Sequence, residues 1–311
     1  MSDLRKNAKG LLKLFRIVPV LAWGISAVTL GVGLALYRTG WNSLRISYLF
    51  LLIFIVSMFQ GLASHAINDV YDWCSGTDQH SKGILSGGTS VIKNKMLDVN
   101  QLKVIAGVAL VLGIGGGLYL VWVRGIFILA LLVIGIWSTI AYTMPPVQLA
   151  YRPLVGEWLG AWPAMAACTW GTFFVLTGTL TPYATAGGVL HATFSVAWLM
   201  QHHLPDIEAD LLASPRKVTT VAFVSLKWGK IYTRYLVMGY FFLLALMGLC
   251  FGLLYNRAFL ISVVFGFVCI WLAHNTNTSN IEHITLRQVG MIALSIGHAF
   301  SLALVFAFRL F

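Results

Sequence analysis

The sequence predicts an all-α, polytopic membrane protein with about nine transmembrane helices. Hydrophobic residues make up 59% of the 311 positions and charged residues only 10%, with a mean hydropathy of +0.83. A soluble domain usually has about 25% charged residues. The chain contains nine apolar runs that are long enough to cross a bilayer as helices. No linker or low-complexity segment separates these runs, so we expect residues 1–311 to form a single membrane domain.

The nine runs follow one another with short polar connections. They lie at about residues 17–37, 45–67, 101–122, 125–143, 154–177, 183–203, 232–255, 258–274 and 288–309. Residues 1–16 are basic and lead into the first run without a small-residue cleavage site, so they predict the basic foot of the first helix. Gly113 and Gly117 in the third run have the spacing of closely packed membrane helices.

The net charge of +11 is explained by the orientation of the chain. With a cytoplasmic N-terminus, all but five of the 21 Lys and Arg residues lie in cytoplasmic segments. The five exceptions are Arg38, Arg45, Arg124, Arg257 and Arg309. This positive-inside bias predicts a multi-pass protein of the plasma or inner membrane, and no nucleic-acid partner is needed to explain the charge.

A cluster of acids marks the end of the second run, in the segment NDVYDWCSGTD. Asn68, Asp69 and Asp72 share one face of a helix, and Asp78 follows. Carboxylates this close raise each other's pKa unless a cation lies between them. Oxygen ligands of this kind suit magnesium, which takes further ligands from a substrate phosphate. The segment therefore predicts a magnesium-bridged diphosphate site at a membrane surface.

Basic residues near this cluster are candidate phosphate ligands. Lys82 precedes the Gly87-Gly88 turn, whose backbone N–H groups can bind an anion. Arg16, at the start of the first run, is either a snorkelling anchor or a phosphate ligand. Arg152, in the loop after the fourth run, either binds a phosphate or pairs with Glu157.

A second acid cluster follows the sixth run. Pro205 breaks the helix, and Asp206 and Asp210 then lie four residues apart on one face. Six of the ten acids in the chain fall in these two clusters, both of which follow an even-numbered run and so face the same side. The six are Asp69, Asp72, Asp78, Asp206, Glu208 and Asp210. We interpret the two clusters as one shared metal site, with Arg216 and Lys217 as further phosphate ligands.

Other polar residues are weaker candidates. His202 and His203 lack a third nitrogen or sulfur ligand nearby, so we expect them to act as hydrogen-bond donors and not as zinc ligands. The four cysteines have no paired metal spacing, and we assign them no chemistry. His274 and the segment NTNTSNIEHITLR either form a solvated connection, which we favour, or close over the site.

The two acid motifs resemble those of the UbiA superfamily of intramembrane prenyltransferases. N-D-x-x-D with a further Asp is present as Asn68, Asp69, Asp72 and Asp78, and D-x-x-x-D as Asp206 and Asp210. The segments SGGTSVI and HHLPDIEAD are similar to the 1,4-dihydroxy-2-naphthoate prenyltransferase branch. The resemblance covers essentially the whole chain. It implies nine helices around a central cavity with cytoplasmic cap loops.

The resemblance also implies the ligands of the site. Two Mg2+ ions hold a polyprenyl diphosphate, one ion on Asn68, Asp69 and Asp72, the other on Asp206 and Asp210. Asp78 is either a ligand or supports one. The basic positions of the family correspond to Arg16, Lys82, Arg152 and Lys217. The chain departs from the family where SPRK replaces the common Gly-Lys-Arg and where AYR lacks a lysine.

The activity that the resemblance implies is Mg-dependent transfer of a prenyl group to a small lipophilic aromatic acceptor in the bilayer, as in quinone or menaquinone biosynthesis. An ionised prenyl diphosphate leaves an allylic cation, which aromatic faces such as Tyr71, Trp73 or Tyr142 could stabilise. His202 or His203 could orient or deprotonate a phenolic acceptor. One alternative is transfer to a carotenoid or a glycerol ether. Another, from a different class, is a cation-coupled transporter.

Overall fold

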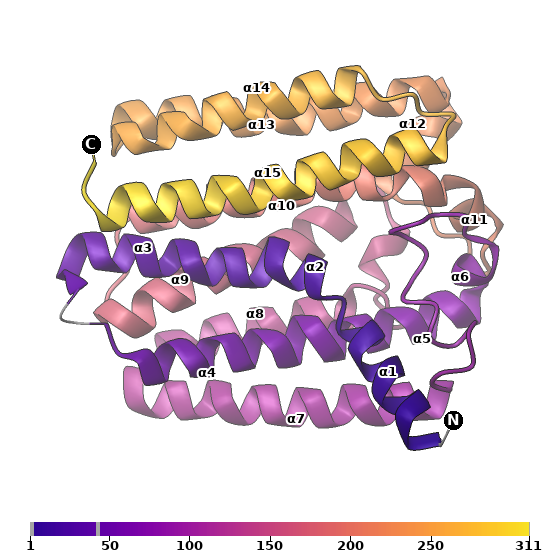
Figure 1. Ribbon diagram of the computed structural model, residues 1–311, viewed down its shortest axis with the longest axis horizontal. Helices are drawn as coiled ribbons and strands as arrows, with labels where there is room; N and C mark the ends of the chain where they lie inside the picture. The colour runs from indigo at the N-terminus through magenta and orange to yellow at the C-terminus, as the bar shows by residue number, and fades with distance from the viewer. Residues whose placement is uncertain (1–2, 42–43, 311) are drawn as a thin grey trace.

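Helices are the only regular elements among residues 3–41 and 44–310, the part of the chain that the computed structural model describes. Their axes run along the long direction of the molecule, with α7 at one edge and the α13–α14 pair at the other (Figure 1). The N-terminus and the short helices α1, α5, α6 and α11 lie at one end of this bundle (Figure 1). The opposite end carries the C-terminus.

Nine helical segments correspond to the nine predicted runs in the described residues, and seven of them meet the length and hydropathy of a membrane span. Seven segments are long and apolar enough to span a membrane: Arg5–Thr39, Ile46–Ser75, Val99–Arg124, Gly156–Thr177, Lys230–Leu254, Arg257–His274 and Ile281–Ala307. The shorter apolar helix α8 (Phe127–Ala141) is the eighth. The ninth, α10 (Pro182–His202), is buried along most of its length and can carry polar residues because neighbouring helices shield it from lipid.

The first crossing differs from the prediction at its basic foot. Helix α1 (Asp3–Phe15) ends before Arg16, whose φ of 46° interrupts the helical hydrogen bonds. Helix α2 (Ile17–Val20), the π-helical turn η1 (Leu21–Ile25) and α3 (Ser26–Thr39) then form the crossing. The basic N-terminal residues therefore form a separate helix (Figure 1).

The second crossing continues further than predicted and carries the first acid motif. Helix α4 (Ile46–Val56), η3 (Ser57–Ser64) and α5 (His65–Ser75) are continuous, and Gly76, with a φ of 92°, ends the run before α6 (Thr77–His80). The acids can remain helical inside the bundle because their carboxylates find partners there. Asn68, Asp69 and Asp72 thus lie on a rigid helix and not on a loop.

The remaining elements follow in chain order. They are α7 (Val99–Arg124), α8, η4 (Leu149–Tyr151), η5 (Gly156–Ala161), α9 (Trp162–Thr177), α10, η6 (Leu204–Asp206), α11 (Ile207–Leu212), α12 (Thr220–Trp228), η7 (Lys230–Tyr232), α13 (Thr233–Leu254), η8 (Arg257–Leu260), α14 (Ile261–His274) and α15 (Ile281–Ala307). Helix α12 was not predicted. Helix α15 begins at Ile281, so half of the segment predicted as a loop is helical.

Close helix packing explains some of the glycines in the crossings, including the predicted Gly113 and Gly117. A Cβ at Gly33 of α3 would lie 2.4 Å from Ala303 Cα of α15, so the first and last crossings are in direct backbone contact. A Cβ at Gly117 of α7 would lie 2.6 Å from Leu132 Cδ1 of α8. Small residues at these points let the helices close around a central space.

A cavity of about 650 Å³ occupies that space. Segments of η1, η3, α8, α9, α10 and the loop of residues 83–90 line it. At one end it reaches the acid motifs, and along the crossings it reaches Leu120, Ile128 and Val175 near the opposite end of the bundle. Neither His274 nor the segment 275–287 lines it, so the solvated-connection interpretation of that region agrees with the structure.

Candidate active site

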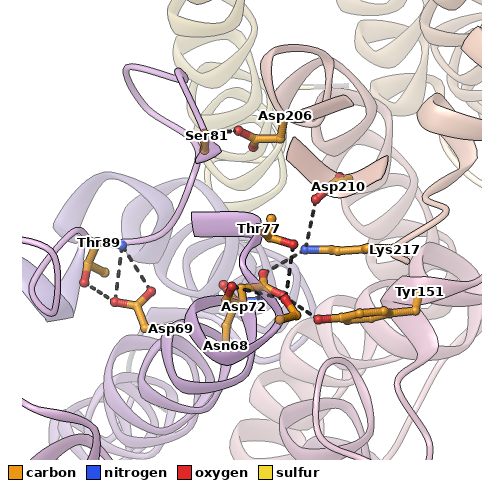
Figure 2. Close-up of polar contacts among 11 residues, drawn as sticks. Asn68, Asp69, Asp72, Thr77, Ser81, Thr89, Tyr151, Asp206, Asp210 and Lys217 are labelled. Carbon is orange, nitrogen blue, oxygen red and sulfur yellow. Dashed lines mark hydrogen bonds and ion pairs between the residues drawn. The ribbon is translucent and has the colours of Figure 1, made fainter. Parts of the chain in front are cut away.

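The two acid motifs meet at the end of the bundle that carries the N-terminus. Helix α5 contributes Asn68, Asp69 and Asp72, and the break between α10 and α11 contributes Asp206 and Asp210 (Figure 2). A backbone hydrogen bond from Ser214 N to Ser75 O, 2.8 Å long, ties the segment after α11 to the end of α5. Two segments that are far apart in the sequence are therefore in direct contact at the site.

Asp72 is the most connected of these acids. Its Oδ2 accepts hydrogen bonds from Asn68 Nδ2 at 2.9 Å and from Lys217 Nζ at 2.7 Å. Its Oδ1 accepts a hydrogen bond from the Tyr151 hydroxyl at 3.1 Å. Because three elements converge on one buried carboxylate, its position is set by the tertiary fold and not by α5 alone.

Lys217 joins the two motifs. Its Nζ lies 2.7 Å from Asp72 Oδ2 and 3.6 Å from Asp210 Oδ1, and Figure 2 shows it between these two carboxylates. The side chain is buried, with 9% exposed. Burial alone lowers the pKa of Lys217, but Asp210 and Asp72 outweigh burial and hold that pKa well above its usual range. Lys217 is therefore a permanent buried cation at the cavity wall.

The loop between α6 and α7 connects both motifs. Thr89 donates to Asp69 from its backbone N–H, at 3.1 Å to Oδ1, and from its hydroxyl to Oδ2. The Ser81 hydroxyl donates to Asp206 Oδ1 at 2.5 Å. Gly88, with a φ of 71°, lies so close to Asp78 that a Cβ would be 2.1 Å from Asp78 Oδ2. The predicted glycine turn thus holds the loop against the acids.

In the metal-free site, burial disfavours the charged form of the remaining acids and raises their pKa values. Burial, then Asp72 and Asp69, raise the pKa of Asp78 to about 9. Burial raises the pKa of Asp206, and the hydrogen bond from the Ser81 hydroxyl opposes this shift. Burial also raises the pKa of Asp210 well above its usual range, although Lys217 opposes it. Acids in such a state favour an added cation.

The donor set fits magnesium. Within residues 3–41 and 44–310, no three His, Cys, Asp or Glu side chains are already close enough to hold a metal ion. The acids nevertheless offer only oxygen ligands, and Asp210 Oδ1 is buried without a hydrogen-bond partner. Buried carboxylates with free oxygens and raised pKa values are suited to a hard divalent cation that also binds a phosphate.

Comparison with known proteins identifies the family. Residues 26–285 match the profile of the UbiA prenyltransferase family. The chain belongs to this family. It is therefore a prenyltransferase and a multi-pass membrane protein. Among curated proteins, no sequence is significantly similar to this chain.

Solved structures of the UbiA family share the fold. A UbiA homologue from Archaeoglobus fulgidus, bound to GPP and Mg2+, has a TM-score of 0.67 at 14% identity, covering 95% of this chain and 100% of its own. The same homologue bound to DMAPP and Mg2+ has a TM-score of 0.65 at 13% identity, over 93% and 98% of the two chains. A structure of digeranylgeranylglyceryl phosphate synthase has a TM-score of 0.58 at 14% identity, over 94% and 99%. The predicted all-helical membrane fold is confirmed.

The structure brings most of the UbiA-type candidates to the cavity. Those that line it are Arg16, Asn68, Asp72, Asp78, Tyr142, His202, His203, Asp206, Asp210 and Lys217. Asp69 lies beside the cavity and is held by Thr89. Arg16 Nη2 donates to Leu85 O at 2.8 Å, and its guanidinium is within electrostatic reach of Asp69 and His202. Arg16 thus lies at the cavity, on the same side as the acid motifs.

Three predicted basic ligands and two predicted aromatic residues, Tyr71 and Trp73, do not line the cavity. Lys82 points outward with 74% of its side chain exposed, and its Nζ lies 3.9 Å from Glu208 Oε2. Arg152 and Arg216 are also exposed. Tyr71 lies about 100° around α5 from Asp72 and packs in a separate apolar cluster with Leu14.

The suggested Arg152–Glu157 pair does not form. Glu157 is buried instead and accepts hydrogen bonds from Thr220 Oγ1 at 2.5 Å and from the Tyr240 hydroxyl at 2.8 Å. Tyr151, the neighbour of Arg152, is the residue of that loop that reaches the site. Sequence analysis missed this role, as it missed Ser81 and Thr89, because hydroxyl donors have no motif of their own. Their closeness to the glycine turn was the one available signal for the latter two.

Proposed function

We propose that this protein transfers a prenyl group from a polyprenyl diphosphate to a hydroxylated aromatic acceptor of the quinone-precursor type, in a reaction that needs two Mg2+ ions. One observation carries the proposal: the two acid motifs converge on buried Lys217 at the mouth of a long apolar cavity. A cation between two acid groups next to an apolar space is suited to a ligand with an anionic head and a hydrocarbon tail.

The acids and two basic residues would hold the diphosphate head. Asn68, Asp69, Asp72, Asp78, Asp206 and Asp210 would bind the ions, which when bound neutralise the charge of the departing diphosphate. Lys217 and Arg16 would contact its phosphate oxygens directly, because both line the cavity. The solved homologue with GPP and Mg2+ supports this assignment of head and metal.

The reaction that these residues would promote is a substitution at carbon. The C–O bond of the prenyl diphosphate breaks and its electron pair leaves with the diphosphate, stabilised by Lys217 and Arg16. The allylic cation accepts an electron pair from an acceptor ring carbon, and that carbon then loses its proton. Tyr142, which lines the cavity near the acids, offers an aromatic face to the cation.

The apolar part of the cavity would hold the prenyl tail and exclude water. Its walls come from residues such as Leu52, Phe59, Leu132 and Val175, which lie on three crossings. Excluding water matters because an allylic cation would otherwise be hydrolysed. The distance that the cavity covers along the crossings supports a long prenyl chain.

We also propose that the N-terminus and the acid loops are cytoplasmic, in a plasma or inner membrane. The bias of Lys and Arg supports this orientation. The similarity of SGGTSVI and HHLPDIEAD to the dihydroxynaphthoate branch supports the quinone-type acceptor.

Prenyl transfer by the purified full-length protein in detergent tests the proposal. Geranyl and geranylgeranyl diphosphate would each be offered with dihydroxynaphthoate, hydroxybenzoate, homogentisate, a carotenoid or a glycerol ether, and the products identified by mass spectrometry. We expect an aromatic product that requires Mg2+ and is abolished by chelator. Asp69→Asn and Asp206→Asn should each abolish it. Glu208→Gln is the matched control, because Glu208 lies in the second motif but points to solvent with 68% of its side chain exposed.

Other outcomes would contradict parts of the proposal. Transfer only to a carotenoid or glycerol ether would replace the acceptor and leave the metal site intact. Protein that binds no prenyl diphosphate with Mg2+, while Asp69→Asn and Asp206→Asn abolish cation-coupled transport, would favour the transporter alternative.

A further inference from the structure

One wall of the cavity carries buried polar atoms that have no partner. Trp23 Nε1, Gln60 Oε1, Trp198 Nε1 and Gln288 Oε1 make no hydrogen bond to any of residues 3–41 and 44–310, and all four side chains line the cavity. Trp198 and Gln288 are each only 1% exposed. Native proteins rarely leave buried donors and acceptors unpaired without a reason. A ligand in the cavity would supply the missing partners.

The four side chains are connected by direct contacts or through a shared neighbour. The rings of Trp23 and Trp198 are stacked with centroids 4.6 Å apart and planes inclined by 22°. Trp198 meets His202 edge to face, and His202 Nδ1 lies 2.6 Å from Gln288 Nε2. Gln60 approaches the residue next to Trp23, since a Cβ at Gly24 would lie 2.4 Å from Gln60 Oε1. Segments from η1, η3, α10 and α15 therefore meet in this wall.

The hydrogen-bonding sense of each free atom follows from its other contacts. Gln60 Nε2 donates to Pro19 O at 3.1 Å, which leaves its Oε1 as the free acceptor. Gln288 likewise uses its nitrogen on His202 and leaves an oxygen. The two indole N–H groups can only donate. The wall thus offers two acceptors and two donors.

The substrates of the acid site do not match this pattern. A prenyl tail has no hydrogen-bonding groups, and a diphosphate offers oxygens that accept but do not donate. A carotenoid hydrocarbon satisfies none of the four atoms. A glycerol ether with one free hydroxyl donates a single hydrogen bond and leaves one glutamine oxygen unpaired. Two hydroxyl groups, each donating once and accepting once, satisfy all four atoms.

We propose, on the basis of the prenyl transfer proposed above, that this wall is the acceptor subsite and that it takes a flat ring with two hydroxyl groups. Each hydroxyl donates to Oε1 of Gln60 or Gln288 and accepts from Nε1 of Trp23 or Trp198. The specificity lies in the two glutamine oxygens, because a site with buried acceptors discriminates strongly against ligands that cannot donate.

Two probe ligands separate the effect of hydrogen-bond donation by the ligand from the effect of its ring shape on binding. The full-length protein, loaded with Mg2+ and an unreactive thiolo analogue of geranyl diphosphate, would be titrated under reducing conditions with 1,4-dihydroxynaphthalene or 1,4-dimethoxynaphthalene. The dimethyl ether keeps the ring and its accepting oxygens but has no O–H. We expect the diol to bind about tenfold more tightly or better, since two hydrogen bonds are at stake.

Substitutions in the wall test whether its side chains cause this difference in affinity between the diol and the ether. Gln60→Met and Gln288→Met should each weaken binding of the diol by about threefold to tenfold and leave the ether unchanged. Trp198→Phe removes only a donor, so it should weaken both ligands. Gln201→Met is the matched control: Gln201 also has a buried, unpaired Oε1, but it does not line the cavity. It should bind both ligands as the wild type does.

Binding of geranyl diphosphate with Mg2+ would be measured in every preparation. It distinguishes failure of the proposed prenyl transfer from failure of the acceptor subsite alone. Wild-type protein that fails to bind it contradicts the proposed function itself. Normal binding of geranyl diphosphate, combined with equal affinity for diol and ether, overturns the subsite alone. So does unchanged affinity for the diol in Gln60→Met and Gln288→Met. Retained binding of geranyl diphosphate also shows that each variant is folded.

Discussion

Lys217 Nζ lies 2.7 Å from Asp72 Oδ2, a residue 145 positions earlier in the sequence, and so connects the two acid motifs. Both side chains are almost completely buried, with 9% and 5% exposed. Breaking a buried ion pair on one side leaves an uncompensated charge, which makes such a pair sensitive to substitution. This contact makes the two acid clusters one site and places a permanent cation where a diphosphate would enter.

Lys217→Met should abolish most of the activity. We expect kcat/KM for the prenyl diphosphate to fall by about 10²- to 10³-fold, the usual effect of losing one preorganised group that stabilises the leaving charge. Steady-state kinetics at saturating acceptor would measure this change.

Lys82→Met and Arg216→Met are the controls for Lys217, because both side chains are exposed and neither lines the cavity. We expect each to stay within about threefold of the wild type, the effect of a screened surface charge. A loss in Lys82→Met equal to that in Lys217→Met would show that Lys82 turns inward when substrate binds.

Mg2+ should stabilise the protein more at high pH. In the unfolded chain Asp78 has the ordinary pKa of 3.8, whereas in the metal-free fold its pKa is about 9. Between these values the folded state holds a proton that the unfolded state has lost, so the free energy of unfolding decreases as pH rises through this window. Bound Mg2+ would replace the proton and offset this loss. Thermal unfolding midpoints at pH 6 and pH 8.5, with Mg2+ and with chelator, measure the effect.

Asp78→Asn tests the assignment of that proton. The neutral amide removes the titrating group, so the chelated variant should lose less stability between pH 6 and pH 8.5 than the chelated wild type. Its stabilisation by Mg2+ should also be smaller. The same Mg2+-induced shift in the wild type at both pH values would contradict this account.

Gly135→Leu should shorten the prenyl chain that the enzyme accepts. Gly135 lines the cavity, and a Cβ there would meet no atom within 4 Å, so a leucine side chain would extend into the space proposed for the tail. We expect kcat/KM for geranylgeranyl diphosphate to fall by about tenfold or more, with dimethylallyl diphosphate little affected. Gly115→Leu is the control, since Gly115 also has open space but does not line the cavity. Equal losses for both diphosphates would place the tail elsewhere.

Glu157→Leu should lower stability without removing the metal site. The change leaves the hydroxyls of Thr220 and Tyr240 without their buried acceptor, and each such loss costs about 1–3 kcal/mol. The thermal midpoint should fall while Mg2+-dependent binding of geranyl diphosphate at low temperature persists. Tyr240→Phe removes one donor and should cause a smaller fall. Loss of geranyl diphosphate binding in folded Glu157→Leu would mean that Glu157 also supports the site.

Short-range sequence patterns were sufficient to predict the helices and the acid residues of the two motifs. The apolar runs predicted all nine crossings to within a few residues at most ends, because a bilayer imposes length and hydrophobicity on each segment independently. The second and last crossings are exceptions: α5 continues to Ser75, eight residues past the predicted end, and α15 begins at Ile281, seven residues before the predicted start. Polar residues extend a helix beyond the lipid as readily as they form a loop. Asn68 and Asp72 were grouped correctly because helical spacing places them on one face.

Short-range sequence patterns did not predict whether a side chain points into the site or toward solvent. Lys82 and Lys217 each follow an acid motif, yet one is exposed and the other is buried between Asp72 and Asp210. The packing of α11 and the loop after it against α5 decides which of the two lysines points inward. The residues next to each lysine in the sequence do not reveal this packing. The contact of Tyr151 with Asp72 was missed for the same reason, and so were the subsite roles that we propose for Gln60 and Gln288, since all three depend on atoms from other crossings.

The sequence by itself determined the membrane class, the positions of the long helices and the acid residues, because hydrophobicity and helical periodicity act over short stretches of chain. Only the tertiary structure decided which basic residue meets those acids, which face of α5 looks into the cavity and which polar atoms are left unpaired on its wall. These features arise from contacts between helices far apart in the chain, where burial makes a single charge or hydrogen bond decisive.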